Sequence, residues 1–369
     1  MQVDLTSSEV ARLRLYNQRI SGPAWTRAEE VVRWLGAAQA QDYQQALWAI
    51  GLRTRQPNVQ DVERAIAEGK LVRTWPMRGT LHLVPAEDAK WMLKLSASRM
   101  IARDGRRLKA LALDESTMEH CARVFAGALA GGKCLSRLEM VALLQNAGID
   151  AAGPRAYHIL WYASQTGLIC PGPMQGKEQT FVLLDEWVPH SRVLSREESL
   201  AELAQRYFTS HGPATVHDFA WWAGLTVSEA RQGAELARTH LTSAELDGKA
   251  CWMAEPDTEP TTLDDLPGVH LLPAFDEYLL GYRDRSAVLA AEHATRVVPG
   301  NNGVFLPTIV VGGQVVGTWK RKLKQSSVEV TLNPFAPLGE AEEQVTEAAR
   351  CYADFLGLPL SATPIAAQA

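Results

Sequence analysis

The feature that most limits the fold of this chain is a pattern of three helices followed by two short strands, which occurs three times. In the first copy, helices are predicted at 7–20, 26–38 and 59–68, and strands at 71–74 and 80–84. The second copy has helices at 117–130, 136–146 and 155–166, and strands at 168–170 and 180–184. The third copy has helices at 196–210, 215–223 and 226–237, and a hairpin within 241–253. Three helices followed by a hairpin is the outline of a winged helix, so we expect a tandem repeat of this motif.

Short polar residues begin the predicted second helix of each copy. Thr26, Ser136 and Thr215 occupy these positions. Their side-chain oxygens can accept hydrogen bonds from the unpaired N–H groups of a first helical turn. The three copies therefore agree in the order and capping of their elements, although they share little sequence identity.

The pattern changes after the third copy. Residues 255–265 carry five acidic residues and no basic one, which is typical of a linker or an exposed loop. Short apolar strands are predicted at 303–308, 309–311, 315–319 and 328–332, with a turn at Gly312-Gly313 and an amphipathic helix at 340–356. This part of the chain is expected to form a small β-rich region.

We therefore expect an α+β protein of four segments. The three winged helices are assigned to residues 1–112, 113–194 and 195–260, and the β-rich region with its hairpin and terminal helix to residues 261–369. A chain of 369 residues is long enough to bury a sizeable core without disulfides or a structural metal.

Composition limits the partners and the compartment. The net charge of -5 argues against broad, purely electrostatic binding to nucleic acid, although a local basic groove is compatible with it. The five cysteines are odd in number and lack C-x-x-C spacing, which favours reduced thiols. Residues 1–10 do not have the pattern of a signal peptide, and no apolar run approaches the length of a membrane span. These features predict a soluble cytoplasmic protein.

The usual catalytic signatures are absent from the sequence. It has no phosphate-binding loop, no G-x-S-x-G, no H-E-x-x-H and no zinc-deaminase motif. His211 and His217 are the closest histidine pair, and neither has a ligand spacing with a partner, so both are interpreted as structural. We therefore expect neither a metal nor another cofactor.

Two clusters of basic residues stand out against the acidic total. Arg99, Arg103, Arg106, Arg107 and Lys109 form the first cluster, with Asp104 as the one acidic residue among them. The second cluster consists of Lys320, Arg321, Lys322 and Lys324. Such clusters are either solvated surfaces or phosphate contacts on the walls of a groove, and repeated winged helices favour the second interpretation.

Two glutamines lie in an apolar setting. Gln39 and Gln41 are preceded by the apolar helix 31–38 and followed by the apolar run 46–52. Glutamines at this spacing are usually surface residues, but apolar flanks on both sides predict partial burial here. Buried amides need hydrogen-bond partners, and at a functional site substrate and water would supply them.

With these motifs in place, the chain resembles the family of tandem winged-helix DNA glycosylases, which has an AlkZ-like branch and an AlkX (YcaQ) branch. The resemblance covers nearly the whole chain. It rests on residues 39–53, 74–82, 212–215, 218–222, 273–278, 302–305 and 317–319. It implies three winged helices around a concave DNA channel and a β-rich C-terminal part. The activity implied is excision of alkylated purines and, in some members, unhooking of interstrand crosslinks.

The resemblance also implies the site residues. The family's catalytic motif is Gln, an apolar residue, then Gln or Asp, so Gln39-Ala40-Gln41 matches the AlkZ-like branch. Ala40 is smaller than the usual central residue, which would widen the site and leaves the detailed substrate preference open. A hairpin that probes the duplex resembles residues 304–319. The residues expected to bind DNA are Arg78, Arg99, Arg103, Arg106, Arg107, Lys320, Arg321, Lys322, Gly312 and Gly313.

The chemistry of such a site follows from the leaving group. An N3- or N7-alkylated purine is cationic and leaves as a neutral base, so no strong general acid is needed. Gln39 and Gln41 would position a water and stabilise the developing sugar cation, and which of them holds the water is left open. Asp42 is the alternative anion. Tyr43, Trp75 and His82 are candidate lesion contacts and equally candidates for core residues, and base flipping and open-groove recognition both stay possible.

The sequence therefore predicts a monofunctional DNA glycosylase that acts on N7-alkylguanine-type lesions in double-stranded DNA. We expect a monomer in the bacterial cytoplasm, associated with the nucleoid. The first rival is a winged-helix transcriptional regulator without catalysis. A protein-interaction scaffold and a hydrolase of another class are weaker rivals, because neither explains the glutamine pair.

Overall fold

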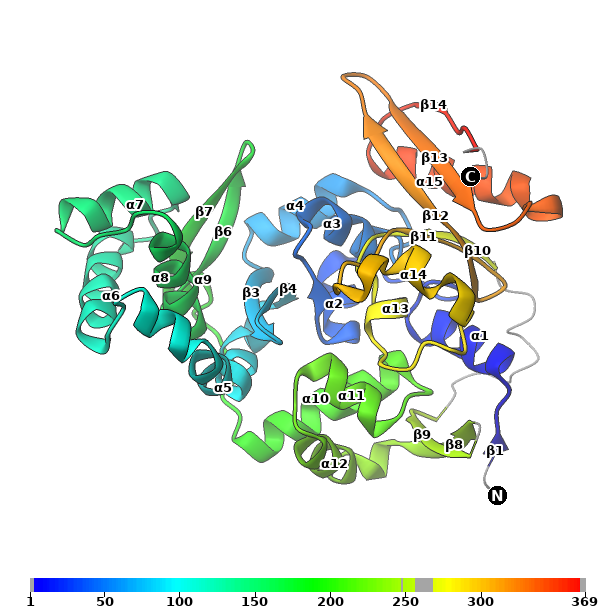
Figure 1. Cartoon of the computed structure of the whole chain (residues 1–369), viewed down its shortest axis with the longest axis horizontal. Coiled ribbons are helices and arrows are strands. Elements are labelled where there is room, and N and C mark those ends of the chain that lie inside the picture. The colour runs from blue at the N-terminus through cyan, green and yellow to red at the C-terminus, as the bar shows by residue number, and fades with distance from the viewer. Residues whose placement is uncertain (1–2, 247, 256–267, 366–369) are drawn as a thin grey trace. The chain divides into compact units, whose positions relative to one another are not determined.

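The computed structural model describes residues 3–246, 248–255 and 268–365 (Figure 1). The chain mixes helices and strands, which confirms the expected α+β class. It divides into two compact units, residues 1–63 with 200–369 and residues 64–199. The predicted acidic linker at 255–265 lies, from residue 256 onward, outside the described residues.

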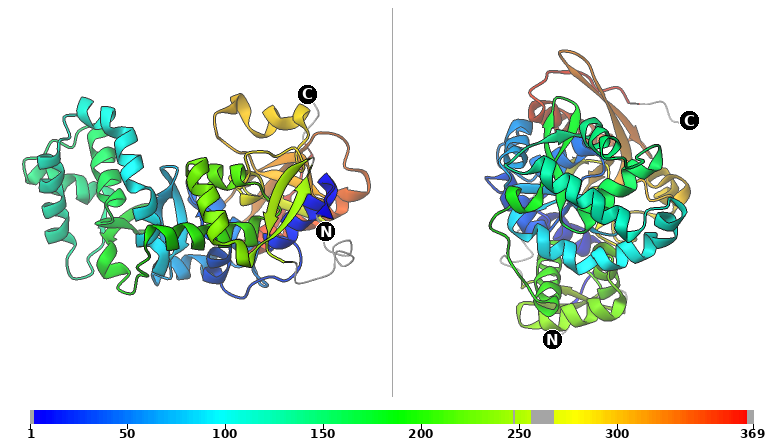
Figure 2. Two further views of the ribbon diagram at one scale, coloured as in Figure 1. Left: turned by 90° about the horizontal axis from the view of Figure 1, so that it is seen from below. Right: turned by 90° about the vertical axis from the view of Figure 1, so that its left-hand side faces the viewer.

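The unit formed by residues 64–199 contains the second winged helix. Its elements are α6 (Glu115–Leu129), β5 (Leu135–Ser136), α7 (Arg137–Asn146), α8 (Pro154–Gln165), β6 (Ile169–Gln175), β7 (Glu178–Leu183) and α9 (Leu184–Trp187). The strands pair in the order β5-β7-β6. The three helices α6, α7 and α8 pack together around a core that contains Phe125, Met140 and Ile159 (Figures 1 and 2). The three helices predicted for this copy are confirmed, whereas β6 runs five residues beyond its expected end at residue 170.

The same unit carries the first wing, which differs from the prediction. Strand β3 (Leu71–Met77) runs three residues beyond its expected end and pairs with β4 (Thr80–Pro85) across a register shift between Thr74 and Met77. The turn is therefore only Arg78-Gly79, with φ angles of 53° and 75°. Two positive φ angles in a two-residue turn fit the twist of a hairpin. Helix α5 (Ala89–Ala110) follows.

In the other unit, the N-terminal helices differ from the prediction. Helix α1 (Ser7–Asn17) precedes the first winged helix, whose three helices are α2 (Ala28–Leu35), α3 (Tyr43–Gly51) and α4 (Val59–Ala67). The helix expected at 26–38 ends at Leu35 because Gly36 has a φ of 83°. The short strand β2 (Ala38–Gln39) then separates α2 from α3, so Gln39 lies on a strand and not at a helix end.

The third winged helix follows the prediction closely. It consists of α10 (Arg196–His211), α11 (Val216–Ala223), α12 (Val227–Leu236) and the hairpin of β8 (Thr242–Leu246) and β9 (Lys249–Met253). Strand β1 (Val3–Asp4) joins β8 in parallel. Thr215 caps α11 and Ser136 caps α7, as expected. In the first copy, however, the helix expected to begin at Thr26 is α2, and its N-cap is Arg27. Asp42 caps the next helix, α3.

The C-terminal region is a five-stranded sheet. Its order is β10 (Val269–Leu272), β11 (Thr308–Val311), β12 (Gln314–Leu323), β13 (Val328–Pro334) and β14 (Leu360–Ala362). Residues 303–307 are not a strand, so the strand expected at 303–308 is wrong. The short helices α13 (Glu277–Leu280) and α14 (Ala294–Val297) lie between β10 and β11 in sequence. Helix α15 (Glu342–Phe355) packs aromatic side chains against Trp48 and Trp319. Among the described residues, no helix has the length and apolar character to span a membrane.

Candidate functional site

The glutamine motif joins strand β2 to helix α3. Gln39 is 8% exposed, Ala40 is fully buried, and Gln41 is exposed. The short extended stretch follows from Gly36, which ends α2, and Asp42, which begins α3 by accepting a hydrogen bond from the Gln45 N–H at 3.2 Å. The structure thus places the two glutamines on one segment, with Gln39 inside and Gln41 at the surface.

The side-chain oxygen of Gln39 is buried, and among the described residues no donor reaches it. A buried acceptor without a donor costs about 1–3 kcal/mol, so native proteins rarely keep one without a reason. The main-chain N–H of the same residue is satisfied, because it donates to Glu277 Oε1 at 3.3 Å. Gln39 therefore has a fixed backbone and a free acceptor available to a water or a substrate.

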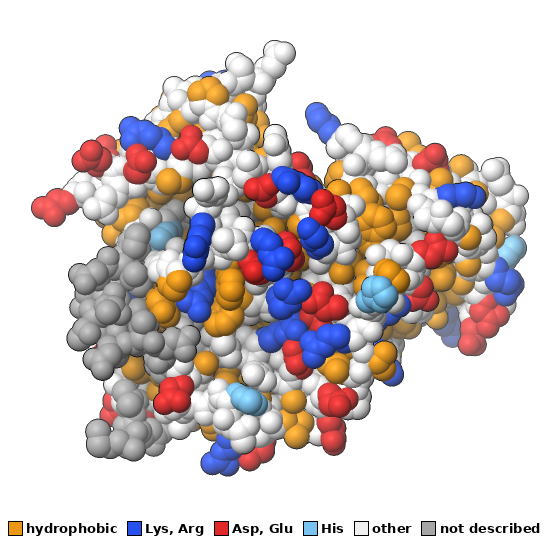
Figure 3. All heavy atoms as spheres, turned by 180° about the vertical axis from the view of Figure 1, so that it is seen from behind, with side chains coloured by type: hydrophobic (Ala, Val, Ile, Leu, Met, Phe, Trp, Pro, Cys, Tyr) orange, Lys and Arg blue, Asp and Glu red, His pale blue; other side chains and the backbone are white. Residues whose placement is uncertain are grey.

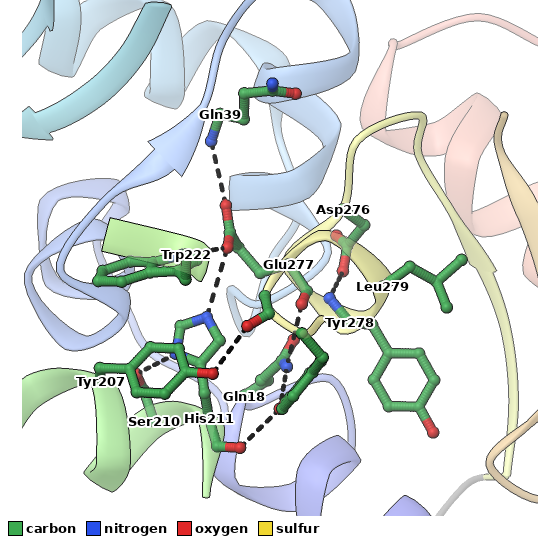
Figure 4. A network of polar contacts seen from close by, with 12 residues as sticks. Gln18, Gln39, Tyr207, Ser210, His211, Trp222, Asp276, Glu277, Tyr278 and Leu279 are labelled. Carbon is green, nitrogen blue, oxygen red and sulfur yellow. Dashed lines mark hydrogen bonds and ion pairs between the residues drawn. The ribbon is translucent and has the colours of Figure 1, made fainter. Parts of the chain in front are cut away.

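A buried polar network supports the backbone of Gln39. Glu277, the first residue of α13, is only 2% exposed. Its Oε2 accepts a hydrogen bond from Trp222 Nε1 at 2.7 Å and lies 3.4 Å from His211 Nε2 (Figure 4). Burial lowers the pKa of His211 and outweighs the opposing effect of the Glu277 carboxylate, so the imidazole is neutral at neutral pH. The Ser210 hydroxyl lies 2.8 Å from His211 Nδ1 and 2.7 Å from the Arg206 main-chain oxygen, and its one hydrogen can be donated to one of the two.

A buried ion pair fixes the residue before Glu277. Arg53 is fully buried and donates to both carboxylate oxygens of Asp276 at 2.9 Å. Its guanidinium also donates to the main-chain oxygens of Gln18 and Ala49, at 2.9 Å and 2.6 Å. The end of α3 and the segment before α13 are therefore held together by hydrogen bonds that use most of the arginine's donors.

Asp42 and Tyr43 stand next to the motif. The carboxylate of Asp42 is exposed and caps α3, which accounts for an acidic residue at this position without a catalytic role. Tyr43 is the first residue of α3 and is half-buried. Two assignments stay predictions: Asp42 as an alternative base and Tyr43 as a lesion contact.

Two other candidate lesion contacts lie in the unit formed by residues 64–199. His82 is fully buried, and its Nδ1 donates to the Thr80 main-chain oxygen at 2.9 Å while Nε2 accepts from Arg78 at 3.4 Å. Trp75 packs with Met100 and Trp161 and lines a pocket of about 170 Å³. Both side chains have internal packing roles, and their contact with a lesion stays a prediction.

The first basic cluster occupies one side of α5. Arg99, Arg103, Arg106 and Arg107 are spaced by four, three and one residues, which places them on one helical face. The last three are exposed and Arg99 is half-buried. Asp104, the acidic residue within the run, lies 2.9 Å from the His158 ring.

The second basic cluster divides between the two faces of β12. Lys320 and Lys322 are exposed and lie on the same face, because side chains alternate along a strand. Arg321 points to the other face, where it donates to the hydroxyl of Tyr352. Lys324 forms an ion pair with Glu329 at 2.9 Å. Lys322 lies opposite Glu329 in the β12–β13 ladder, so the Glu329 carboxylate attracts both Lys322 and Lys324.

The turn at Gly312-Gly313 is packed against the protein on one side. The Gly313 main-chain oxygen accepts a hydrogen bond from the Tyr278 hydroxyl at 2.7 Å, and a Cβ at this position would lie 2.8 Å from the Cβ of Ala11. Gly312 is exposed. Gly313 therefore allows close packing against α1, and the contact of both glycines with DNA stays a prediction.

Charged side chains of both signs are mixed on the face drawn in Figure 3. This agrees with the small net charge of -5. Among residues 3–246, 248–255 and 268–365, no group of three or more His, Cys, Asp or Glu side chains is arranged to hold a metal ion.

Sequence reasoning missed Glu277, Trp222, Arg53 and Asp276 as parts of the site. His211 was interpreted as structural, and its ring does stack on Tyr207 at 4.8 Å. One signal was present: Asp276-Glu277 is a pair of acidic residues within the apolar stretch 271–282. Buried acidic residues need partners, which makes such a pair a candidate for a functional site.

Comparisons with known proteins point to one family. The family model of AlkZ-like DNA glycosylases matches residues 32–355. A curated relative from Streptomyces sahachiroi, named an interstrand DNA cross-link repair glycosylase, is 26% identical over 361 residues, covering 93% of this chain and 95% of the relative. The solved structure of the Streptomyces sahachiroi DNA glycosylase AlkZ matches with a TM-score of 0.80 and 25% identity. This match covers 99% of this chain and 100% of that one.

Proposed function

Because this chain belongs to the family of AlkZ-like DNA glycosylases, we propose that it hydrolyses the N-glycosidic bond of cationic alkylated purines of the N7-alkylguanine type in double-stranded DNA. The observation that carries the proposal is the Gln39 amide oxygen, which is buried and has no donor among the described residues. A glycosylase needs such an acceptor, held in place before the substrate arrives.

The reaction needs neither a strong general acid nor a strong general base from the protein. A cationic purine leaves as a neutral base, and the sugar passes through an oxocarbenium-like state. The Gln39 carbonyl accepts a hydrogen bond from the attacking water and turns the negative end of its dipole toward the sugar. Gln41, exposed two residues later, is assigned to the substrate side of the same segment. No cofactor takes part in this scheme.

The range of lesions extends to crosslinks in this proposal. A related protein is named an interstrand DNA cross-link repair glycosylase, which supports unhooking of crosslinked purines by this chain as well. Such an adduct stays attached to the opposite strand, so it needs a site that is open to the duplex. The small side chain of Ala40 between the two glutamines agrees with a wide site. We assign the enzyme to the bacterial cytoplasm, at the nucleoid, as a monomer.

The expected substrate preference tests this proposal. The wild-type protein should release N7-methylguanine from a duplex and leave uracil and normal purines in place, because an uncharged amide does not help a neutral base to leave. Duplexes with one lesion each would be incubated with the protein, and abasic sites counted after alkaline cleavage. The double variant Gln39→Ala, Gln41→Ala is the control and should be inactive.

Two results would contradict the proposal. Efficient release of uracil would require a stronger catalyst than a pair of amides. A folded wild-type protein that binds the duplex but leaves N7-methylguanine intact would favour the alternative, a winged-helix regulator.

Salt dependence tests the assignment of DNA contacts to β12. The double variant Lys320→Ala, Lys322→Ala should bind duplex more weakly and reduce the slope of log affinity against log salt by about 1.8, since each phosphate contact contributes about 0.9. Fluorescence anisotropy at several salt concentrations measures the slope. Lys324→Ala is the matched control, because its ammonium group is already paired with Glu329. Equal slopes for both variants would remove Lys320 and Lys322 from the interface.

A further inference from the structure

We propose that Glu277 is a positioning residue for the catalytic glutamine: its carboxylate holds the backbone of Gln39, and Trp222 and His211 of the third winged helix hold the carboxylate. The inference rests on the proposed function of Gln39. It also adds to that function, because it places a determinant of catalysis 238 residues away in the sequence.

Both carboxylate oxygens of Glu277 are in use. Oε1 accepts from the Gln39 N–H at 3.3 Å, and Oε2 accepts from the Trp222 indole N–H at 2.7 Å with His211 Nε2 at 3.4 Å (Figure 4). The side chain is 2% exposed, so solvent is a poor substitute for these donors. The Glu277 carboxylate therefore connects β2 to α10 and α11 by hydrogen bonds.

The main chain of Glu277 is fixed as well. Phe275, two residues earlier, has a φ of 59°, which is uncommon for a residue with a large side chain. Asp276 is held by Arg53 and accepts from the Tyr278 N–H at 2.9 Å. The Glu277 main-chain oxygen accepts from Gln18 Nε2 at 3.4 Å. Residues in this uncommon conformation persist where their surroundings hold them, and these contacts hold the segment that carries Glu277.

The carboxylate of Glu277 accepts hydrogen bonds at both of its oxygens, whereas an amide of the same shape accepts at only one end. Burying a charged carboxylate costs free energy, so a neutral side chain would be favoured at a position where a single acceptor is enough. Three groups face the two oxygens of Glu277, and a carboxylate accepts at both ends. In the variant Glu277→Gln, the amide NH₂ group would face either the Gln39 N–H or the Trp222 N–H, and one of these contacts would become repulsive.

The consequence for catalysis concerns the direction of one side chain. The Gln39 amide oxygen has no protein donor among the described residues to orient it, so its position depends on its own backbone. A displacement of about 1 Å of a positioned group can cost about 100-fold in rate. The Glu277 contact keeps the backbone of β2 from shifting, and thereby keeps the oxygen aimed at the attacking water.

The test compares Glu277→Gln with wild type by three measurements. The first-order release of N7-methylguanine at saturating enzyme should fall by about 10- to 100-fold. Duplex affinity by anisotropy should change by less than about threefold, because Glu277 is buried and makes no contact with DNA in the scheme proposed here. Amide hydrogen exchange in the segment 36–43 should become faster. Glu343→Gln, an exposed residue of α15, is the matched control and should leave all three unchanged.

A double-mutant cycle separates positioning from a general structural role. If Glu277 acts through Gln39, Glu277→Gln should cost less than about threefold in rate when Gln39 is already alanine. Trp222→Phe keeps the aromatic ring and removes one donor to Glu277, so it should show a weaker form of the same defect. If Glu277→Gln does not fold, Trp222→Phe can be used in its place in the same measurements.

Equal losses from Glu277→Gln in the wild-type and Gln39→Ala backgrounds would overturn the positioning role. So would a wild-type rate in Glu277→Gln together with unchanged exchange at 36–43. An inactive wild-type protein would overturn the proposed function and the catalytic consequence of this contact. The exchange measurement would then still report whether Glu277 holds β2.

Discussion

Replacing Gln39 by alanine is expected to lower the rate of N7-methylguanine release by about 10²- to 10³-fold, which is the usual effect of removing one oriented dipole from a site where charge develops. Duplex affinity should change by less than about threefold, because the side chain is 8% exposed and offers little surface to the DNA. Protein stability should rise slightly or stay the same, since the variant also removes a buried oxygen without a donor.

Single-turnover kinetics on a one-lesion duplex would measure the rate. Gln44→Ala is the matched control, because Gln44 lies on α3 near the motif and has no role in the proposed mechanism. Two further variants separate the neighbouring residues. Gln41→Ala should lower the rate less than Gln39→Ala, and Asp42→Asn should keep most activity, because asparagine is also a good helix cap. Loss of activity in Asp42→Asn with retention in Gln39→Ala would show that Asp42 is the base.

The variant Arg53→Met is expected to lower the free energy of unfolding by about 3–5 kcal/mol, because it leaves the Asp276 carboxylate as an unpaired charge in the interior. Arg53 is fully buried and donates to Asp276, Gln18 and Ala49, so the loss includes several hydrogen bonds. Urea denaturation followed by tryptophan fluorescence would measure the change. The same variant should also slow base release, because Asp276 adjoins Glu277.

A surface arginine provides the comparison. Arg123 lies 4.0 Å from Glu119, and both side chains are more than half exposed. Arg123→Met should therefore change stability by less than about 1 kcal/mol. An Arg53→Met variant as stable as Arg123→Met would mean that water reaches Asp276 and that the pair is not a buried ion pair in solution.

The parts of the fold that the sequence predicted well are those with local signals. In the second and third winged helices, α6, α7, α11 and α12 begin at residues whose side chains cap them. Ser136 and Thr215 accept from the N–H groups of Glu139 and Asp218 at 3.3 Å and 3.1 Å, as their spacing predicts. Each of these features depends on a few neighbouring residues, so it can be recognised without knowledge of the rest of the chain.

The prediction failed where burial removes the local signal. Helix α3 is buried from Gln45 to Gly51, so its sequence shows no alternation between a polar and an apolar face. The prediction therefore contains no helix at 43–51, extends the second helix to residue 38 beside the glutamine motif, and counts α1 as the first helix of the repeat. In the structure, Gly36 ends α2, and Gln39 lies on a strand. The predicted segment boundaries at 112, 194 and 260 stay predictions.

The repeated winged-helix pattern, the two basic clusters and the glutamine motif can be recognised in the sequence, because each consists of residues close together in the chain. The tertiary structure alone decided that Gln39 is buried with a free oxygen, that Lys320 and Lys322 are exposed while Arg321 is not, and that Glu277 lies behind Gln39. Hydrophobic periodicity and capping describe how a segment folds on itself. They carry no information about which distant segment supplies the partner of a buried polar group, and that pairing depends on how the whole chain packs.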